Sequence, residues 1–284
     1  MTERRGLLIR HAATRIAAIS RHVEVAPRCL LYHSLVARPV RDAAELTIGV
    51  DLFDAHLAHL AATGRRIVDA GQMAADLGMG AAEPRTVAIT FDDGFADNHD
   101  LALPVVIQHG ITITVFIAAN VLTGRTVAEM PARPLDLGRV REMLASNHVT
   151  FGCHGASHRR LRGLPPSVLR DEIVGAKAHL EDLLGRAVML FAYPYGAPDS
   201  FDSATRATVR AAGFSAAFTS MFGPNGPDVD PYALRRCRAS WVDDLPWFES
   251  ILDGRQDWYR AYQSMRAALS VLLRGGNRES EWSA

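Results

Sequence analysis

Short apolar runs and longer amphipathic runs follow one another in regular succession along this chain. The strand-like runs are rich in β-branched and aromatic residues. They are Cys29–His33, Val87–Phe91, Thr112–Ile117, Val149–Cys153, Val188–Ala192, Ser215–Thr219 and Leu234–Arg238, with a short one near Ile67. The helix-like runs between them are Leu52–Ala62, Asp100–His109, Asp136–Ser146, Pro166–Leu184 and Ser203–Ala212. This alternation predicts an α/β fold with a parallel sheet, a closed or nearly closed (β/α) barrel of seven or eight units.

Amphipathic patterns also mark both ends of the chain, outside the predicted barrel at 28–250. The basic segment 1–27 and the C-terminal segment 251–284 repeat apolar residues every three or four positions, as Trp258 and Tyr262 do. Such helices could cover the barrel core, lie on a membrane surface or form a homodimer interface, and covering the core is the simplest interpretation. No segment reaches the ~18 apolar residues of a membrane span. We expect a cytoplasmic protein, with the inner membrane surface as an alternative location.

The composition narrows the class of protein. Acidic and basic side chains are equal in number, 31 of each among 284 residues, which gives no reason to expect a nucleic-acid partner. The three cysteines, Cys29, Cys153 and Cys237, are odd in number and far apart in the sequence. They do not resemble a disulfide framework, and they fit a reducing compartment.

Two adjacent carboxylates, Asp92 and Asp93, follow the strand-like run Val87–Phe91 in the motif TFDDG. Neighbouring like charges at the end of an apolar strand repel each other, and a bound metal ion would offset that repulsion. Catalytic residues of barrel enzymes also gather at the ends of strands. Because a DD pair alone is often a solvated turn or a helix cap, its interpretation depends on what lies beside it.

A second polar cluster, HGASH, places His154 and His158 four residues apart after the run Val149–Cys153. If this stretch turns helically, both imidazoles lie on one face and can chelate a metal, although such a pair alone is commonly a chance feature of a helix face. Two histidines and one carboxylate suit a divalent ion, with Zn²⁺ as the first choice and Co²⁺ or another divalent ion as the alternative. Asp93 is the candidate third ligand, which leaves Asp92 free to act as a base.

TFDDG and HGASH, together with FAYPYG at residues 191–196, resemble the first three motifs of the NodB-type polysaccharide deacetylases, carbohydrate esterase family 4. The resemblance extends from about Cys29 to Arg238, which is most of the chain. It implies a distorted (β/α) barrel with the NodB fold. It also implies a metal-dependent hydrolysis of N-acetyl groups on amino sugars.

The resemblance further implies roles for single residues. It makes Asp92 the base, and it makes Asp93 and the two histidines of HGASH the metal ligands. Tyr195 would donate its backbone N–H to the oxyanion of the reaction, and Pro194 and Tyr195 would line the substrate groove.

Two departures from the family pattern lead to further predictions. The third motif of the family carries an arginine where this chain has Ala192, and we predict that Arg236 replaces it, with a solvated charge as the alternative.

The family's last motif, Leu-x-x-His, has no match after residue 196, but LLYH near the N-terminus matches its spacing. A barrel can be circularly permuted without moving any side chain in space. The chain resembles the exopolysaccharide-deacetylase subgroup of the family, whose motifs follow such a permuted order. We therefore predict that His33 is the general acid and that Leu30 lines the acetyl pocket, with a packed core histidine as the alternative.

These residues predict a metal-dependent amino-sugar N-deacetylase in the synthesis of an exopolysaccharide, such as a biofilm or holdfast-like adhesin, or of a cell-surface glycan. Its substrate would be an N-acetylated glycan or a lipid-linked or nucleotide-linked amino sugar. Two alternatives stay open: another amide hydrolase on the same barrel, such as a deformylase or a ureide hydrolase, and a catalytically silent glycan-binding barrel. The intact base, ligands and acid favour the deacetylase, whereas Ala192 keeps the silent barrel open. Trp241 and Trp247 could either stack on a sugar ring or fill a loop.

Overall fold

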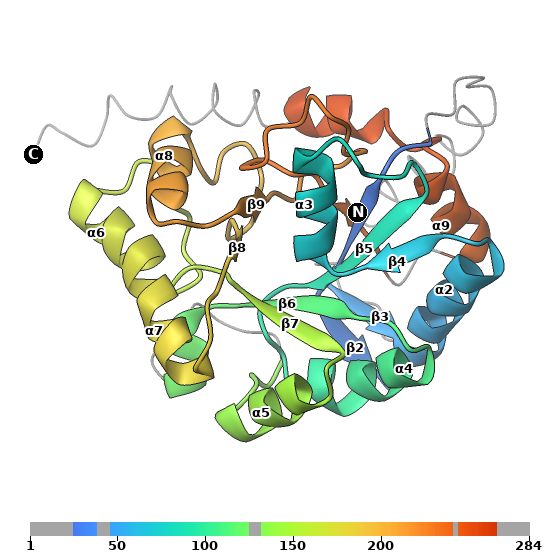
Figure 1. Ribbon diagram of the computed structural model, residues 1–284, viewed down its shortest axis with the longest axis horizontal. Coiled ribbons are helices and arrows are strands. Elements are labelled where there is room, and N and C mark those ends of the chain that lie inside the picture. The colour runs from blue at the N-terminus through green and yellow to red at the C-terminus, as the bar shows by residue number, and fades with distance from the viewer. Residues whose placement is uncertain (1–24, 39–45, 125–131, 241–243, 266–284) are drawn as a thin grey trace, which may run out of the picture.

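A curved sheet of parallel strands forms the centre of the molecule in the computed structural model, which describes residues 25–38, 46–124, 132–240 and 244–265 (Figure 1). Its strands follow the order β10–β1–β5–β6–β7–β8–β9, and β4 pairs with β5. Their bounds are β1 (Arg28–Tyr32), β4 (Arg66–Val68), β5 (Thr86–Phe91), β6 (Ile113–Ile117), β7 (Val149–Cys153), β8 (Leu190–Ala192), β9 (Ala216–Phe218) and β10 (Cys237–Arg238). Every strand predicted from the sequence lies in this sheet.

The sheet departs from a regular barrel along one edge of β5. That edge pairs with β4 through residues 86–88 and with β6 through Thr90 and Phe91, while the opposite edge pairs with β1. A parallel bridge between Phe218 and Leu234 joins β9 to the segment that enters β10, and β10 pairs with β1. The strands thus close on one another, which confirms the predicted distorted (β/α) barrel. The circular permutation stays a prediction.

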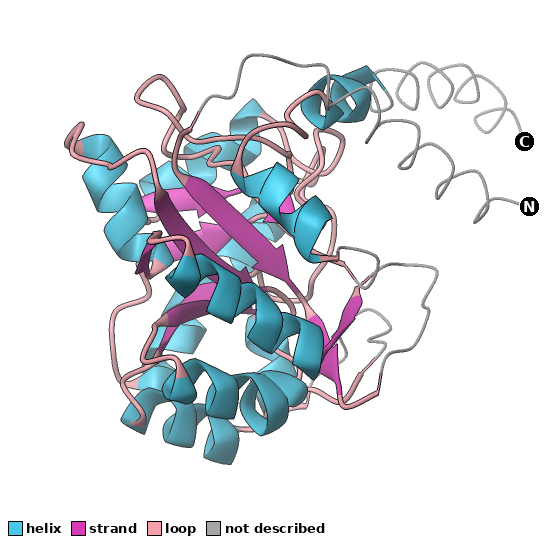
Figure 2. Ribbon diagram, turned by 90° about the vertical axis from the view of Figure 1, so that its right-hand side faces the viewer, coloured by secondary structure: helices cyan, strands magenta, loops and turns pink. Residues whose placement is uncertain are grey.

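Helices cover the outer side of the sheet, and a small pair of strands lies apart from it (Figure 2). The helical elements are α2 (Val50–Ala62), η1 (Asn98–Ala102), α4 (Leu103–Gln108), η2 (Ala119–Thr123), α5 (Leu137–Ala145), α6 (Pro166–Arg170), η3 (Asp171–Gly175), α7 (Ala176–Leu184), α8 (Ser203–Ala211) and α9 (Leu245–Leu252). The small pair is β2 (Ser34–Val36) and β3 (Thr47–Gly49). The helices predicted from the sequence are confirmed, and two of them contain a π-helical turn, at η1 and η3.

A helix that the sequence pattern does not predict, α3 (Ala70–Gly78), decides at which end the barrel opens. Asp69 caps this helix by accepting two backbone hydrogen bonds. Met73 of α3 joins the apolar cluster inside the barrel, and the Ala70 backbone N–H donates to Thr114 Oγ1 at 3.1 Å. Because Thr114 lies near the start of β6, α3 closes the barrel at the N-terminal ends of the strands. The C-terminal ends stay open.

The two predicted terminal helices fall largely outside the described residues. Residues 1–24 and 266–284 are not described, whereas residues 259–265 are helical. None of the helices in the described ranges is both long and apolar enough to cross a membrane. All three cysteines are buried and free, as their positions in the sequence predict.

Candidate active site

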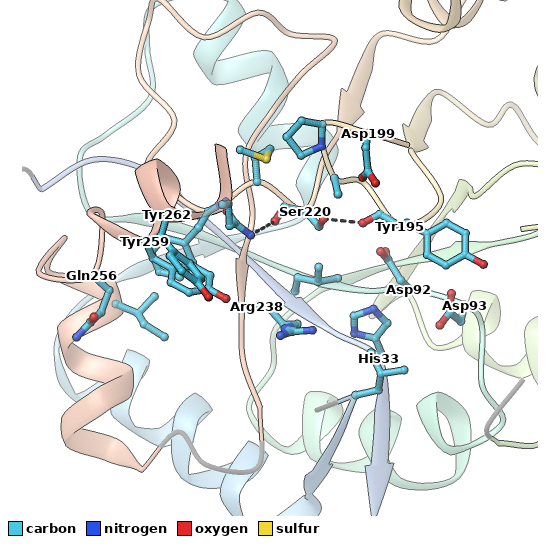
Figure 3. A pocket seen from close by; sticks show the side chains of 18 of the residues that line it. His33, Asp92, Asp93, Tyr195, Asp199, Ser220, Arg238, Gln256, Tyr259 and Tyr262 are labelled. Atoms are coloured by element: carbon cyan, nitrogen blue, oxygen red, sulfur yellow. Dashed lines mark hydrogen bonds between the residues drawn. The ribbon is translucent and has the colours of Figure 1, made fainter. Parts of the chain in front are cut away.

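A pocket of about 590 Å³ opens at the C-terminal ends of the strands (Figure 3). Its reactive side chains come from different strands: His33 follows β1, Asp92 and Asp93 follow β5, His154 and His158 follow β7, and Tyr195 follows β8. Because parallel strands end at one face of a barrel, segments that are distant in the sequence meet there. The structure thus brings most of the predicted site residues into one cavity.

The Asp92 carboxylate lines this pocket, is only 3% exposed, and is held by an arginine. Arg236 donates from Nη1 and Nη2 to its two oxygens at 2.6 and 2.7 Å, a bidentate pair. Arg236 is itself fixed, since its Nε donates to the Thr219 carbonyl at 2.8 Å and its guanidinium lies over the Phe116 ring. Burial acts to raise the pKa of Asp92, but the charge and hydrogen bonds of Arg236, together with the charges of His154 and His33, outweigh it and the pKa lies below its usual value. The carboxylate is therefore ionised and held in one orientation.

Arg236, which directly precedes β10, makes the contact with Asp92 that a replacement for the missing third-motif arginine requires. Its side chain is 1% exposed, which does not fit the alternative of a solvated charge. Ala192, at the end of β8, is fully buried and cannot reach Asp92 with its methyl group. The contact between Arg236 and Asp92 is the one that an orienting arginine needs, and its part in a reaction stays a proposal.

Asp93, His154 and His158 form a cluster whose ligand atoms all lie within 4.8 Å of one another. Asp93 Oδ1 lies 3.6 Å from His154 Nε2 and 3.1 Å from His158 Nε2. The two histidines come together without the helical turn that the sequence left open, because the loop is irregular and Gly155 and His158 have φ values of 76° and 56°. Positive φ is uncommon outside glycine. In this loop it accompanies the return of the His158 ring toward Asp93.

The donor atoms of this cluster fit a divalent metal ion. Donors bound to one ion at about 2.0–2.1 Å lie roughly 3–3.5 Å apart, close to the two separations measured from Asp93. His154 Nδ1 donates to the Ala192 carbonyl at 2.8 Å, which orients the ring with Nε2 toward the cluster. Burial lowers the pKa of His154 to about 4, so the ring is neutral at physiological pH and able to bind a metal.

His33 reaches the same pocket from the end of β1 (Figure 3). Its backbone carbonyl accepts a hydrogen bond from Asn98 Nδ2 at 2.8 Å, which fixes the residue at the end of the strand. Burial lowers the pKa of the ring, while the nearby carboxylates of Asp93 and Asp92 act in the opposite direction. Its Nδ1 is buried without a hydrogen-bond partner in the described part of the chain. His33 therefore faces the carboxylates and is not a packed core histidine.

Tyr195 lies beside the metal-ligand cluster in a left-handed backbone conformation, with φ at 64°. Its ring centroid lies 4.9 Å from that of His158 and 4.5 Å from the guanidinium carbon of Arg160. Its carbonyl accepts a hydrogen bond from Ser220 Oγ at 2.6 Å, whereas its backbone N–H bonds to none of the described residues.

Two predicted substrate contacts are wrong. Leu30 is fully buried in the apolar cluster that also includes residues of α2, and the pocket is lined by its neighbour Leu31. Side chains alternate along a strand, so Leu31 and His33 share the face from which Leu30 points away. Pro194 is also buried and does not line the pocket; its ring lies beside Gly155 in the histidine loop.

A residue that the sequence pattern does not single out holds the histidine loop in place. Glu172 lies in the π-helical turn η3 and is 5% exposed. Its Oε2 accepts hydrogen bonds from the backbone N–H groups of Ala156 and Ser157 at 3.1 and 3.0 Å, and its Oε1 accepts from Ser157 Oγ. Glu172 lies on the buried face of its helix, where a charged residue is unusual, and this position in the helical pattern could have identified it.

The far side of the pocket is built by the C-terminal part of the described chain. The lining residues there are Trp247, Ile251, Gln256, Trp258, Tyr259, Tyr262 and Gln263. Tyr259 of the C-terminal segment and Trp247 of α9 also pack against the core. The described part of the segment therefore contacts both the core and the pocket.

The comparison with protein families gives one clear match, the polysaccharide deacetylase family, whose model matches residues 79–217. A protein of Bacillus subtilis (strain 168) that is named as a polysaccharide deacetylase, YxkH, is 27% identical over 156 residues. The aligned part is 55% of this chain and 52% of that protein, so the chain spans about half the length of this relative. The matched residues include TFDDG, HGASH and FAYPYG, but neither His33 nor Arg236.

Solved structures share the fold over most of the chain. The deacetylase PplD of Streptococcus pyogenes, determined in complex with acetate, has a TM-score of 0.70 at 20% identity and covers 81% of this chain and 99% of that one. IcaB of Ammonifex degensii has a TM-score of 0.68 at 25% identity, with 81% and 97% covered. The fold described above is therefore that of known deacetylases.

Proposed function

Because the model of the polysaccharide deacetylase family matches residues 79–217 of this chain, we propose that the chain is an amide hydrolase of this family and removes N-acetyl groups from the amino sugars of a polysaccharide. One observation carries the proposal. The oriented Asp92 carboxylate lies directly beside the metal-ligand cluster, with its Oδ2 3.8 Å from His154 Nε2. Amide hydrolysis needs a base that takes a proton from water and an electrophile that polarises the carbonyl. Asp92 would be the base, and a metal ion held by the neighbouring cluster would be the electrophile.

Asp93, His154 and His158 would hold the metal, which we propose to be Zn²⁺, with Co²⁺ as a substitute. A divalent ion in such a site supplies Lewis acidity, which lowers the pKa of water and polarises a carbonyl. The neutral His154 and the carboxylate of Asp93 are in the protonation states that this binding requires.

The chain's own residues carry the remaining steps. Asp92 accepts a proton from the attacking water, and Arg236 keeps that carboxylate ionised and oriented. Attack on the acetyl carbonyl carbon gives a tetrahedral oxyanion, to which the Tyr195 N–H donates. His33, in the imidazolium form that the nearby carboxylates of Asp93 and Asp92 favour, donates a proton to the sugar nitrogen as the C–N bond breaks, and acetate and a free amine leave. Acid–base assistance of this kind contributes about 10²–10⁴-fold to a rate.

We also propose the circularly permuted order of motifs, with the acid on the first strand of the barrel. The sheet order supports it, because β1 lies between β10 and β5. The strand that ends in LLYH is thus next to the strand that precedes the carboxylates, with Tyr32 paired to Phe91.

The material on which the enzyme acts is part of the same proposal. We propose an N-acetylated exopolysaccharide, such as a biofilm or holdfast-like adhesin, or a cell-surface glycan. A lipid-linked or nucleotide-linked amino sugar, the cytoplasmic location at the inner membrane and a homodimer stay predictions.

Acetate release from N-acetylglucosamine oligomers tests the proposed function. Protein stripped by a chelator should lose its activity and regain it with Zn²⁺ or Co²⁺. His158→Ala should lower zinc affinity at least 10-fold, because it removes one of three protein ligands. His179→Ala, a histidine of α7 outside the pocket, is the matched control and should leave zinc content and activity unchanged. Full activity of the stripped protein would contradict the proposal.

A further inference from the structure

We propose that the far end of the pocket is a platform for the sugar units next to the one that reacts, so that the enzyme acts on an extended glycan chain. The inference rests on the proposed function and adds the place where the neighbouring sugar units of the polysaccharide would bind. His33, Asp92 and Asp93 lie on one side of the view in Figure 3, and Tyr259 and Tyr262 lie on the other. One cavity connects them, so a chain that places a sugar at the carboxylates extends toward the aromatic residues.

The platform is a cluster of aromatic rings that remains open to the pocket. The ring centroids of Trp258 and Tyr259 are 5.8 Å apart, those of Tyr259 and Tyr262 are 5.5 Å apart, and those of Phe222 and Tyr259 are 5.6 Å apart. Rings that only fill a core are covered on all sides. Here Trp258 keeps 38% of its surface exposed, and an exposed aromatic group that continues a catalytic pocket indicates a binding surface.

The chemistry of this surface suits a sugar ring. A pyranose has faces of C–H groups and edges of hydroxyl groups, so it needs an apolar plane with hydrogen-bonding groups beside it. Aromatic side chains give a large rigid plane, and a tyrosine hydroxyl both donates and accepts hydrogen bonds. Tyr259 supplies both within the same lining. The buried Gln256 amide orients the neighbouring ring, since its Oε1 accepts from Trp258 Nε1 at 3.1 Å and its Nε2 donates to Ser250 Oγ at 2.8 Å.

The platform is fixed to the barrel by partly buried side-chain contacts. The Asp257 carboxylate accepts hydrogen bonds at 2.5 and 2.9 Å from the guanidinium of Arg28, which is fully buried at the start of β1. Gln263 Nε2 donates to the Ser220 carbonyl at 3.2 Å, and its Oε1 accepts from the Phe222 N–H at 2.7 Å. Ser220 Oγ in turn donates to the carbonyl at the reactive end of the pocket (Figure 3). The two ends therefore keep a fixed separation.

The test compares kcat/KM for acetate release from the dimer and the hexamer of N-acetylglucosamine. In the wild-type protein the value should rise about 10-fold or more with length, because additional units contact the platform. Trp258→Ala and Tyr259→Ala should lower the hexamer value about 10-fold and the dimer value much less, and Trp258→Phe should restore most of the loss. Ile107→Ala, a comparably exposed apolar residue of α4, is the control and should change neither value.

A binding measurement separates this inference from the proposed function. The hexamer is titrated calorimetrically into zinc-loaded Asp92→Asn protein, with and without Trp258→Ala. Binding that depends on Trp258 supports the platform, and it would do so even if the wild-type protein released no acetate and the deacetylase proposal failed. Kinetics that do not depend on length, equal losses on dimer and hexamer, or hexamer binding that is absent or unaffected by Trp258→Ala would each overturn the platform.

Discussion

The two ends of the pocket are built in different ways. The reactive end consists of residues that directly follow barrel strands, as Asp92 follows β5 and His154 follows β7. The far end comes from α9 and from the segment 256–263 that follows it, and this segment is held to the barrel by side-chain contacts. Proton transfer needs atoms placed within a fraction of an ångström, which strand ends provide. Contact between an aromatic ring and a sugar tolerates wider variation.

This difference predicts two kinds of variant. A change at the reactive end should slow the chemical step for substrates of every length. A change at the far end, or in the contacts that hold it, should alter the preference among lengths and leave the chemistry itself in place.

Asp92→Asn should have the largest effect. The amide keeps the shape of the side chain but cannot accept the proton of water, so we expect kcat to fall by about 10⁴-fold for dimer and hexamer alike. Acetate release measured by NMR, with the zinc content of the same sample, checks this. A loss of kcat for the hexamer alone would contradict the claim that the reactive end acts on substrates of every length.

His33→Ala should cost about 10²–10³-fold on the amide substrate, because the leaving amine must be protonated. The matched substrate is 4-nitrophenyl acetate, whose leaving group departs without a proton. On this ester the loss should stay within about threefold. Equal losses on the amide and the ester would mean that His33 acts through the structure of the site and is not the acid.

Arg236→Met should lower kcat by about 10²-fold, because it leaves Asp92 without an orienting partner. It should also lower the free energy of unfolding by about 3 kcal/mol, since a buried carboxylate loses its counter-charge. Adding Ala192→Arg to this variant returns an arginine to its usual position in the family. We expect at least a 10-fold recovery of kcat, as measured by acetate release. A folded, zinc-loaded double variant without recovery would contradict the assignment of Arg236.

Asp257→Asn should have the smallest effect. It weakens the partly buried pair with Arg28 that anchors the platform, so the hexamer kcat/KM should fall about threefold while the dimer value changes less. Urea unfolding should show a loss of about 2 kcal/mol. Asp253→Asn is the matched control, because Asp253 pairs with the nearly buried Arg65 at 3.0 Å but is not part of the pocket lining. A similar shift in length preference for both variants would count against the platform.

The sequence reveals the reactive end well because TFDDG and HGASH keep their functional residues together at strand ends. It leaves open the loop between the histidines, where spacing alone allows a helical turn. The positive φ values of Gly155 and His158 produce an irregular loop instead. Strand alternation also explains why Leu31 and not Leu30 lines the pocket, a register that the motif pattern does not specify.

The far end and α3 could not be predicted because both depend on tertiary contacts. The run AGQMAADLG has few large apolar residues and a weak helical pattern, and α3 is stabilised by packing inside the barrel. The repeat of Trp258 and Tyr262 correctly predicts a helix, present at 259–265. Aromatic residues at helical spacing show the same sequence pattern whether they face a core or a pocket. Here the contact of Asp257 with Arg28, which are far apart in the sequence, helps to place these residues beside the pocket.

The most direct test of the central claim measures acetate and free amine together during incubation of the N-acetylglucosamine hexamer with the zinc-loaded wild-type protein. The claim that this pocket hydrolyses N-acetyl groups predicts one new amine for each acetate, with both products absent for Asp92→Asn. Neither product from the wild-type protein, or the same yield from Asp92→Asn, would contradict it.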